Sequence, residues 1–429
     1  MAMIRPEAEM KESGIKWIGN IPRNWKMRKI NSLFENIGSG TTPNSNIEEY
    51  YQGMINWLQS GDINGTIVKS TKKHISNEIV SNTSALTVYK APFIAIAMYG
   101  ASIGNISIVD IDACTNQACC VLVKPTKDIY MQFAFWGLMA AKEELVLSSR
   151  GGGQPNISQN IIKQLRIPVP NISEQENIAD YLDKTCSKID EIIAEAKASI
   201  DEYKKLKQSV IDNATMTGIH DSEMKNTDYV WFPEMPKSWD LVLASLLFRE
   251  DVRPVDANDV SLSLSQVDGL IPTDDMSERS LKSATHDNWK HVIPDDLVLN
   301  RFKGHLGVFF ASKYTGMVSF HYGVYHAIRD DVYAKYYEYL FHSTTYKNIF
   351  ALKSNGITVG LQNLSNGNFY SVKILHPTLD EQIEIVKYLD KRIAEIDSLL
   401  AEKESLINDL EAYKKSLIYE VVTGKRRVV

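Results

Sequence analysis

A long internal repeat constrains this chain of 429 residues more than any other feature of its sequence. Asn156-Ile157-Ser158 recurs as Asn363-Leu364-Ser365, at an offset of 207 residues. The same offset carries residues 174–184 onto 381–391, including Glu-Gln and Tyr-Leu-Asp-Lys in both copies. Because the register holds over about 60 residues without a gap, we expect the two copies to adopt the same local structure.

The front of each half also repeats, but at a different offset. The pattern Pro-x-x-Trp at residues 22–25 returns 214 residues later at 236–239. Between front and end the matches are few, and the clearest one places residues 94–96 on 297–299, at an offset of 203. We therefore expect two halves with similar ends and dissimilar middles.

The repeated ends have the pattern of long helices. Apolar side chains recur at alternating steps of four and three residues over 178–210 and 385–417, a spacing typical of a coiled-coil seam. Gly218 and Gly424 follow these segments, as is usual at helix ends. Residues 173–217 alone would form a helix about 68 Å long. The predicted seam of the helix pair consists of Leu182, Ile189, Ile192, Tyr203, Leu206, Leu389, Ile396, Leu399, Leu406, Leu410 and Tyr413.

The segments between the helices have mixed patterns. Short β-like runs occur at 67–68, 93–98, 106–109 and 120–123 in the first half and at 297–300, 308–311 and 317–325 in the second, and helix-like stretches follow at 130–148 and 332–353. We expect an α+β fold with two mixed domains separated by two long, antiparallel coiled-coil helices with pseudo-two-fold symmetry. The predicted limits are 1–170 for the first domain, 171–220 for the first helix, 221–376 for the second domain and 377–429 for the second helix. The alternative is that the helices only join two copies of the chain.

Composition excludes several classes of protein. With 44% hydrophobic and 23% charged residues, the chain is neither disordered nor collagenous. The four cysteines lack the spacing of a disulfide framework or a zinc site, so buried thiols in a reducing compartment are expected. The N-terminus has no apolar signal region, and the longest apolar run is too short to span a bilayer. We expect a cytoplasmic protein that has no membrane partner.

A search for catalytic motifs finds none. The chain has no G-x4-G-K-[ST] loop, no HExxH, no acid-x-Lys soon after Pro294-Asp295, and no Asn/Asp-Pro-Pro-aromatic motif of the amino-methylating enzymes. Residues 38–40 and 151–153 are glycine-rich, but neither has the strand-to-helix context of a dinucleotide site. His321 and His326 are not at a spacing that places both on one helix face. We therefore predict a chain that is not an enzyme, with no catalytic and no metal-binding residues.

The formal charge of −6 at first argues against a nucleic-acid partner, but the charge is unevenly distributed. Residues 1–170 have a net charge of +4, whereas 171–220, 221–376 and 377–429 have −4, −4 and −2. Lys and Arg neutralise phosphates, and Arg and Gln also bond to base edges. The candidate DNA-binding residues lie in three basic or polar loops: Lys69, Lys72, Lys73, Arg150, Gln154, Arg301, Lys303 and His305.

Several motifs, in their order, resemble the specificity (S) subunit of type I restriction–modification enzymes, the HsdS family. The segment 10–25, Met-Lys-Glu-Ser-Gly-Ile-Lys-Trp-Ile-Gly-Asn-Ile-Pro-x-x-Trp, is similar to the usual start of that family. Residues 37–43, Ile-Gly-Ser-Gly-Thr-Thr-Pro, are similar to one type of its target-recognition domain, and 154–158, 167–170 and 173–175 resemble its conserved region. The C-terminal segment 413–425 resembles the end of the family's chains.

The resemblance implies that the two domains are target-recognition domains, each recognising one half of a split sequence in double-stranded DNA. The helices would set the spacer and dock two methyltransferase (M) subunits, with restriction (R) subunits joining the full complex. S-adenosylmethionine, ATP and Mg²⁺ would then belong to the partner subunits, and this chain would need no cofactor. The second domain lacks the Gly-Ser-Gly-Thr-Thr-Pro motif and contains Ser-Leu-Ser-Leu-Ser at 261–265, so an asymmetric target is expected. The alternatives are a coiled-coil scaffold that does not recognise DNA and a self-contained restriction or methyltransferase enzyme.

Overall fold

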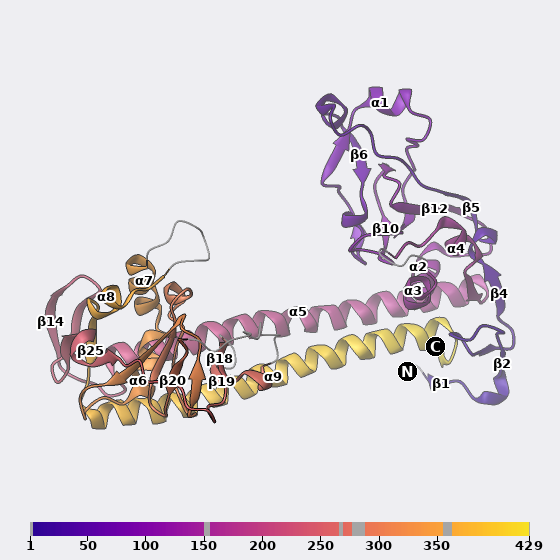
Figure 1. The fold of residues 1–429 in the computed structure, drawn as a ribbon. Helices are drawn as coiled ribbons and strands as arrows, with labels where there is room; N and C mark the ends of the chain where they lie inside the picture. Colours follow the sequence, from indigo (N-terminus) through magenta and orange to yellow (C-terminus); the bar gives the residue numbers. More distant parts are fainter. Residues whose placement is uncertain (1–2, 150–154, 266–268, 277–287, 355–362, 429) are drawn as a thin grey trace. The chain divides into compact units, whose positions relative to one another are not determined.

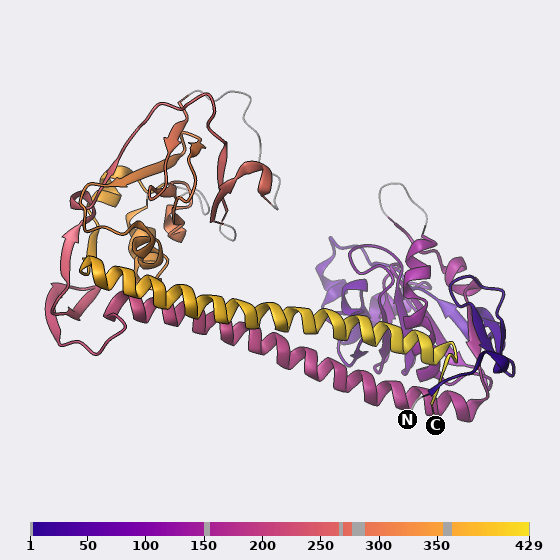
Figure 2. The same ribbon diagram turned by 90° about the horizontal axis from the view of Figure 1, so that it is seen from below.

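The computed structural model describes residues 3–149, 155–265, 269–276, 288–354 and 363–428. These residues form two compact units: unit 1 contains residues 1–196 and 406–429, and unit 2 contains residues 197–405. Each unit combines a strand-rich domain with parts of two long helices, which confirms the predicted α+β class (Figures 1 and 2). No helix in the described ranges is long and apolar enough to cross a membrane.

The domain of unit 1 is built on a five-stranded sheet with strand order β5-β12-β9-β10-β7, in which only the β10–β7 pair is parallel. A smaller sheet has the order β11-β6-β8. The pairs β2–β3, β4–β13 and β1–β26 complete the strands of the unit. The strands are β1 (Met3–Ile4), β2 (Met10–Glu12), β3 (Asn20–Pro22), β4 (Lys26–Lys29), β5 (Phe34–Gly38), β6 (Ile55–Leu58), β7 (Ile67–Val68), β8 (Lys73–Ile75), β9 (Phe93–Ala97), β10 (Ile106–Val109), β11 (Ala113–Thr115), β12 (Cys119–Pro125), β13 (Arg166–Val169) and β26 (Arg426–Arg427), and the short helices are α1 (Asn77–Asn82), α2 (Met131–Ala140), α3 (Lys142–Leu147) and α4 (Gln159–Gln164).

The domain of unit 2 is built on a four-stranded antiparallel sheet with strand order β17-β24-β21-β22. Four two-stranded pairs surround it: β14–β15, β16–β25, β18–β19 and β20–β23. The strands are β14 (Met224–Tyr229), β15 (Phe232–Pro236), β16 (Asp240–Leu243), β17 (Phe248–Glu250), β18 (Leu262–Ser265), β19 (Gly269–Pro272), β20 (Lys290–Val292), β21 (Leu297–Asn300), β22 (Phe309–Ala311), β23 (Gly316–Val318), β24 (Tyr322–Ala327) and β25 (Lys373–His376), and the short helices are α6 (Ala334–Phe341), α7 (Thr344–Lys353) and α8 (Asn366–Tyr370).

The two main sheets share an order that the sequence repeat did not predict. The order β5-β12-β9-β10 in unit 1 corresponds to β17-β24-β21-β22 in unit 2, and β9, β10 and β12 lie close to 203 residues before β21, β22 and β24. The expectation of dissimilar middles is therefore wrong for the sheet. A buried strand needs only apolar side chains of suitable size, so its sequence can change while its position is kept.

Two long helices connect the domains, as predicted: α5 (Ile172–Thr217) and α9 (Leu379–Val422). The predicted limits at 170 and 220 fall in the short links before and after α5, and 376 is the last residue of β25, which precedes α9. In unit 1, Asp190 of α5 pairs with Lys414 of α9 at 2.6 Å. In unit 2, Lys207 of α5 pairs with Asp397 of α9 at 2.7 Å. The two ion pairs are the same pair at an offset of 207 with the helices exchanged.

Both units show that the helices run antiparallel. In unit 1, Arg5 bonds both Glu174 near the start of α5 and the carbonyl oxygen of Gly424 just after α9. In unit 2, His220, which follows α5, contacts Glu384 near the start of α9. The start of one helix thus lies beside the end of the other within each unit.

The predicted seam is right in spacing but displaced by one residue at every second position. Leu182, Ile189, Leu389 and Ile396 are buried, and Tyr203 and Leu410 are half-buried. The other five predicted seam residues are exposed, so their assignment is wrong: Ile192, Leu206, Leu399, Leu406 and Tyr413.

At each of these five points the seam is occupied instead by the residue one position farther along the chain. Ile193, Leu400 and Ile407 are buried or half-buried there, and at the last two points the seam residues are Lys207 and Lys414. A lysine can cover a seam with its aliphatic stem while its ammonium group reaches a carboxylate, here Asp397 or Asp190. A pattern that counts only apolar residues misses this arrangement.

All four cysteines are buried and unpaired, as expected of structural thiols. Burial raises the pKa of the Cys114 and Cys186 thiols to about 11. Both thiols are therefore protonated at neutral pH and unreactive.

Candidate nucleic-acid interface and helix clamps

A cluster of hydrogen bonds ties the start of α5 to the domain of unit 1. The indole Nε1 of the buried Trp25 donates to Glu174 at 3.1 Å. The next residue, Gln175, is fully buried; its amide accepts from the backbone N–H of Tyr130 at 2.8 Å and donates to the carbonyl oxygens of Asp128 and Pro170. We call this Trp-Glu-Gln cluster the helix clamp of unit 1.

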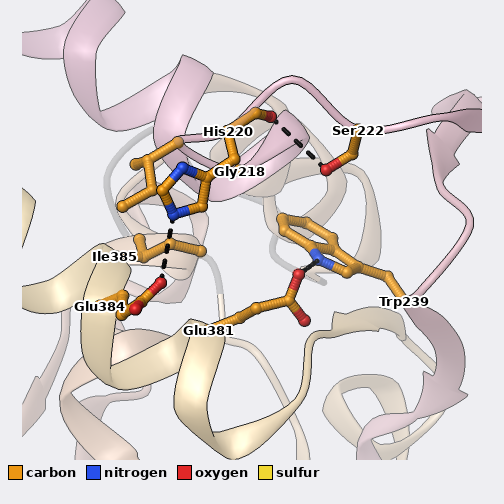
Figure 3. Close-up of a pocket in the computed structure, with 8 residues that line it drawn as sticks. Gly218, His220, Ser222, Trp239, Glu381, Glu384 and Ile385 are labelled. Atoms are coloured by element: carbon orange, nitrogen blue, oxygen red, sulfur yellow. Dashed lines mark hydrogen bonds and ion pairs between the residues drawn. The ribbon is translucent and has the colours of Figure 1, made fainter.

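Unit 2 contains the same clamp at the start of α9. Trp239 donates to Glu381 at 3.2 Å, and Gln382 accepts from the N–H of Tyr333 at 2.8 Å while donating to the carbonyls of Asp331 and Pro377 at 2.9 Å. Figure 3 shows Trp239 and Glu381 together with the neighbouring His220–Glu384 contact.

The clamp of unit 2 fixes the protonation state of its carboxylate. Burial alone would raise the pKa of Glu381, but hydrogen bonds from Thr378, Trp239 and Ser238 lower that pKa below its ordinary value overall. A charge-assisted bond from an indole N–H is stronger than a neutral one. The ionised form of Glu381 therefore stabilises the junction between the domain and α9.

In the sequence the clamp residues stand out only as part of the repeat, which by itself does not predict that they bond to one another. Pro-x-x-Trp and Glu-Gln repeat at different offsets, 214 and 207, which separates them in any simple alignment. A usable signal was present, since a tryptophan and a glutamine kept in both halves each need a specific partner when buried.

The basic segment of unit 1 leaves its three lysines at the surface. Lys69, Lys72 and Lys73 are exposed, while Thr71 between them is buried and bonds the carbonyl of Lys73 at 2.8 Å. No ion pair reaches these lysines from the part of the chain that the structure describes. Their positive charge is thus available to an anionic partner.

The Gly-Ser-Gly-Thr-Thr-Pro loop lies beside this segment. Tyr51 links the two, since its hydroxyl bonds the carbonyl of Pro43 at 2.7 Å and its ring lies 5.9 Å from the ammonium of Lys73. Gly40 lies against β11, where an added Cβ would come within 1.8 Å of the Thr115 carbonyl oxygen. Only glycine permits this approach.

Sequence reasoning missed one polar pair in this loop. The hydroxyl of Thr42 bonds the amide of Gln117 at 2.6 Å, and both side chains are exposed. The predicted contacts Arg150 and Gln154 lie outside the described residues.

Arg301 takes part in a network of bonds within the domain of unit 2. Its guanidinium bonds Glu250 at 2.5 Å and Asn366 at 2.8 Å, and Glu250 also pairs with the buried Lys290 at 2.7 Å. The hydroxyl of Tyr325 completes this internal network through Asn366 at 2.8 Å. The guanidinium is thus held by partners of its own domain while 22% of the side chain stays exposed, and DNA binding by Arg301 stays a prediction. The sequence does not show that Glu250, 51 residues earlier, lies beside it.

Lys303 is exposed, whereas the side chain of His305 lies outside what the structure describes. Next to Lys303 the ring of Phe302 lies 4.9 Å from that of His321, and the ring of Phe320 lies 3.8 Å from that of His321. Phe302 and Phe320 are both exposed. An aromatic surface beside a lysine is a suitable contact for bases or sugars.

Several acidic side chains between Asp251 and Asp296 are paired within the domain of unit 2. Arg253 bonds Asp251 at 2.8 Å and the buried Asp296 at 2.7 Å, and His291 contacts Asp259 at 2.7 Å. Some of the carboxylates of this domain are therefore already paired with cationic side chains of the domain itself. Among the described residues no cluster of His, Cys, Asp and Glu has the geometry of a metal site.

The fold and the clamps define a class of chain in which a strand-rich domain fixed to a long helix occurs twice. The family model for the type I restriction modification DNA specificity domain matches residues 22–202 and 273–408, well over half of the chain. The chain belongs to this family.

Curated relatives carry the same description. The chain is 25% identical over 250 residues to the MjaIX type I restriction enzyme specificity subunit of Methanocaldococcus jannaschii, covering 56% of this chain and 55% of that subunit. It is 26% identical over 152 residues to the EcoR124I/EcoR124II specificity subunit of Escherichia coli, covering 34% and 37%. With the EcoKI specificity subunit of Escherichia coli K12 it shares 21% over 324 residues, covering 73% and 69%. The chain thus spans about half and about a third of the first two relatives.

Two solved structures share the fold. A chain from a structure of the assembly and conformational transition of the type I R-M system superposes with a TM-score of 0.70 at 14% identity, covering 94% of this chain and 99% of that chain. The HsdS subunit from Thermoanaerobacter tengcongensis gives a TM-score of 0.55 at 13% identity, covering 96% and 99%.

Proposed function

We propose that this chain is the DNA-recognising specificity subunit of a type I restriction–modification complex. The observation that supports this most is the contrast within the repeat: the clamps and ion pairs are kept in both units, whereas the outer loops differ. A basic segment beside a Gly-Ser-Gly-Thr-Thr-Pro loop belongs to unit 1 and an aromatic surface around His321 belongs to unit 2. Each domain recognises one half of an asymmetric bipartite target in double-stranded DNA.

The remaining parts of the proposal concern the partners. Two methyltransferase subunits dock on the helices, and restriction subunits join the complete assembly. S-adenosylmethionine, ATP and Mg²⁺ are bound by those partners, so this chain directs the reaction without performing it. The complex acts in the cytoplasm.

Exchange of one domain tests DNA recognition. The chain is coexpressed with its methyltransferase partner, and methylated adenines are mapped across the cellular DNA. Replacing residues 222–370 by the corresponding segment of another specificity subunit should change one half-site completely and leave the other unchanged. Unchanged methylation would refute the proposal, and partner binding without any DNA footprint would favour the scaffold alternative. Methyl transfer or cleavage by the purified chain alone would instead indicate a self-contained enzyme.

The spacer role of the helices has its own test. Inserting four residues after both Glu195 and Glu402 lengthens each helix by about 6 Å. At about 3.4 Å per base pair, the spacer in the methylated sequence should grow by about two base pairs. A variant with the same four residues inserted in the β14–β15 turn should keep the original spacer. An unchanged spacer in the helix variant would exclude this role.

A further inference from the structure

A short turn is kept in both units. Residues 116–118 join β11 to β12 in unit 1, and residues 319–321 join β23 to β24 in unit 2. The offset is 203 residues, as it is between the starts of β10 and β22, of β11 and β23, and of β12 and β24. In both turns the N–H of the residue after the turn donates to the carbonyl of its first residue, at 3.3 Å in unit 1 and 3.0 Å in unit 2. The two turns are therefore equivalent.

The middle residue of the turn is exposed in each unit but differs in its chemistry. It is Gln117 in unit 1 and Phe320, which is 52% exposed, in unit 2. Binding residues often lie on loops that a rigid scaffold holds in place. A kept turn with a changed side chain at its tip is the arrangement expected where one structural element recognises two different ligands.

In unit 1 the side chain at the tip is held in one orientation. The hydroxyl of Thr42 donates to Oε1 of Gln117 at 2.6 Å, which fixes the side of the amide on which the oxygen lies. Nε2 of Gln117 donates to no group in the described part of the chain. The amide therefore keeps its N–H donors and one lone pair of its oxygen for a partner.

The residues on both sides of Thr42 are anchored to the domain. The carbonyl of Thr41 accepts from the indole of the buried Trp57 at 3.4 Å, and the carbonyl of Pro43 accepts from the hydroxyl of Tyr51 at 2.7 Å. These bonds hold Thr42 in place before any partner arrives. A side chain that is already ordered loses less conformational freedom on binding.

The exposed lysines lie at the same end of the small sheet as Gln117. Thr115 of β11 lies opposite Leu58, the last residue of β6. Since β8 runs antiparallel to β6 and begins at Lys73, the chain before Lys73, with Lys72, lies at that end too. Strands β11 and β8 are two strand spacings apart, about 10 Å. The major groove is about 12 Å wide, so a lysine at a phosphate and Gln117 at a base edge can contact one groove together.

In unit 2 the tip of the turn is apolar. The ring of Phe320 lies 3.8 Å from that of His321, and the ring of Phe302 lies 4.9 Å from the same histidine. Lys303, which follows Phe302, is exposed. Phe320 has no polar group that could bond a base, so it recognises a base through apolar contact.

We propose that the tip of this turn recognises one base pair in each half of the target. Gln117 binds an adenine in the major groove, and Phe320 contacts the methyl group of a thymine. A glutamine amide donates to N7 and accepts from the N6 amine of adenine, and an aromatic ring packs against the thymine methyl. The inference rests on the proposed function and adds to it the residue that determines one base of each half-site.

Variants of Gln117 in the complete methyltransferase complex test the assignment, with methylated sites mapped across the cellular DNA. Gln117→Leu should reduce the preference for adenine at one position of the half-site of unit 1 by roughly 10-fold to 100-fold. Gln117→Glu should move the preference at that position to cytosine, because a carboxylate accepts from the N4 amine of cytosine. A misfolded turn cannot create a new preference, so this second result is independent of any folding defect.

Three further variants complete the experiment. Thr42→Val, at the positioning residue, should weaken the adenine preference less than Gln117→Leu does, at the same position. Phe320→Ala should relax one position in the half-site of unit 2 and none in that of unit 1. The matched control Gln164→Leu removes an exposed glutamine of α4 and should leave both half-sites unchanged.

The outcomes separate this inference from the proposed function. The domain exchange described above assigns each half-site to its unit. An unchanged half-site of unit 1 in both Gln117 variants, or a change in the half-site of unit 2 instead, would overturn the inference. If the wild-type complex methylates no specific sequence, the proposed function itself fails, so the two failures are distinguishable.

Discussion

The two units are alike near the helices and different away from them. Both use a tryptophan, a glutamate and a buried glutamine to hold the start of a helix, and both pair the same lysine and aspartate between helices. Their outer loops differ: exposed lysines beside the Gly-Ser-Gly-Thr-Thr-Pro loop belong to unit 1, whereas the exposed rings of Phe302 and Phe320 around His321 belong to unit 2.

The regions near the helices and the loops away from them meet two different requirements. The junction between a domain and its helix has to be kept if the same partners are to bind at both ends of the chain. The loops away from the helices are free to change, and with them the sequence that is recognised. A domain can thus be replaced without disturbing the assembly, provided that the clamp is retained.

The largest effect that should distinguish the units comes from Arg301. Replacing it with methionine removes one of the two cationic partners of the Glu250 carboxylate. Unit 2 should therefore lose about 3–5 kcal/mol of stability. Native-state hydrogen exchange read by mass spectrometry measures this loss in each unit separately. Lys303→Met, an exposed control on the same loop, should change the exchange by less than about 0.5 kcal/mol. Equal losses of stability in both variants would show that Arg301 contributes no more to the stability of unit 2 than an exposed lysine does.

The two helix clamps, by contrast, should contribute equally to the stability of their units. Gln175→Leu and Gln382→Leu each leave one backbone N–H and two carbonyl oxygens without their partner inside the protein. Because an unsatisfied buried group costs about 1–3 kcal/mol, each variant should destabilise its own unit by about 3 kcal/mol. The same exchange experiment gives the values. A loss confined to one unit would show that the clamps are not equivalent.

A smaller effect should distinguish the DNA contacts of the units. The triple variant Lys69→Gln/Lys72→Gln/Lys73→Gln removes three exposed charges from unit 1. The methyltransferase complex should bind its target about tenfold more weakly at low salt, and the slope of log affinity against log salt should fall by up to about 3. Fluorescence anisotropy with a labelled duplex measures both quantities. Changing Lys184, Lys205 and Lys387, exposed lysines of the long helices, to glutamine should leave the slope unchanged.

The smallest effect concerns acid stability. The pKa of Glu381 is lower in the folded chain than its ordinary value of 4.5, so the unfolded chain takes up this proton at a higher pH. The stabilisation is complete above pH 4.5 and is lost as the pH falls from there through the folded pKa. Urea unfolding midpoints between pH 7 and pH 3 should therefore fall less steeply for Glu381→Gln than for the unaltered chain. An identical slope would exclude a contribution from this carboxylate.

The sequence predicted the long helices, their limits and many strands because those elements depend on short-range patterns. It displaced the seam at Leu206 and Tyr413, where the seam residue is a half-buried lysine whose role depends on an aspartate on the other helix. It also gave no sign of the internal bonds of Arg301, since its partners Glu250 and Asn366 are far away in the chain. Contacts of this kind become visible only once the chain is folded.

The pairing of β1 with β26 has a consequence for the synthesis of the protein. Arg5 bonds the carbonyl oxygens of Gly424 and Lys425, so unit 1 needs residues that lie 419 positions apart or more and are translated at very different times. Unit 2 is continuous from residue 197 to 405 and is complete before the last part of α9 has been translated. Unit 2 can therefore fold on the nascent chain before unit 1 is complete, and a premature stop after residue 405 would leave only unit 1 unfinished.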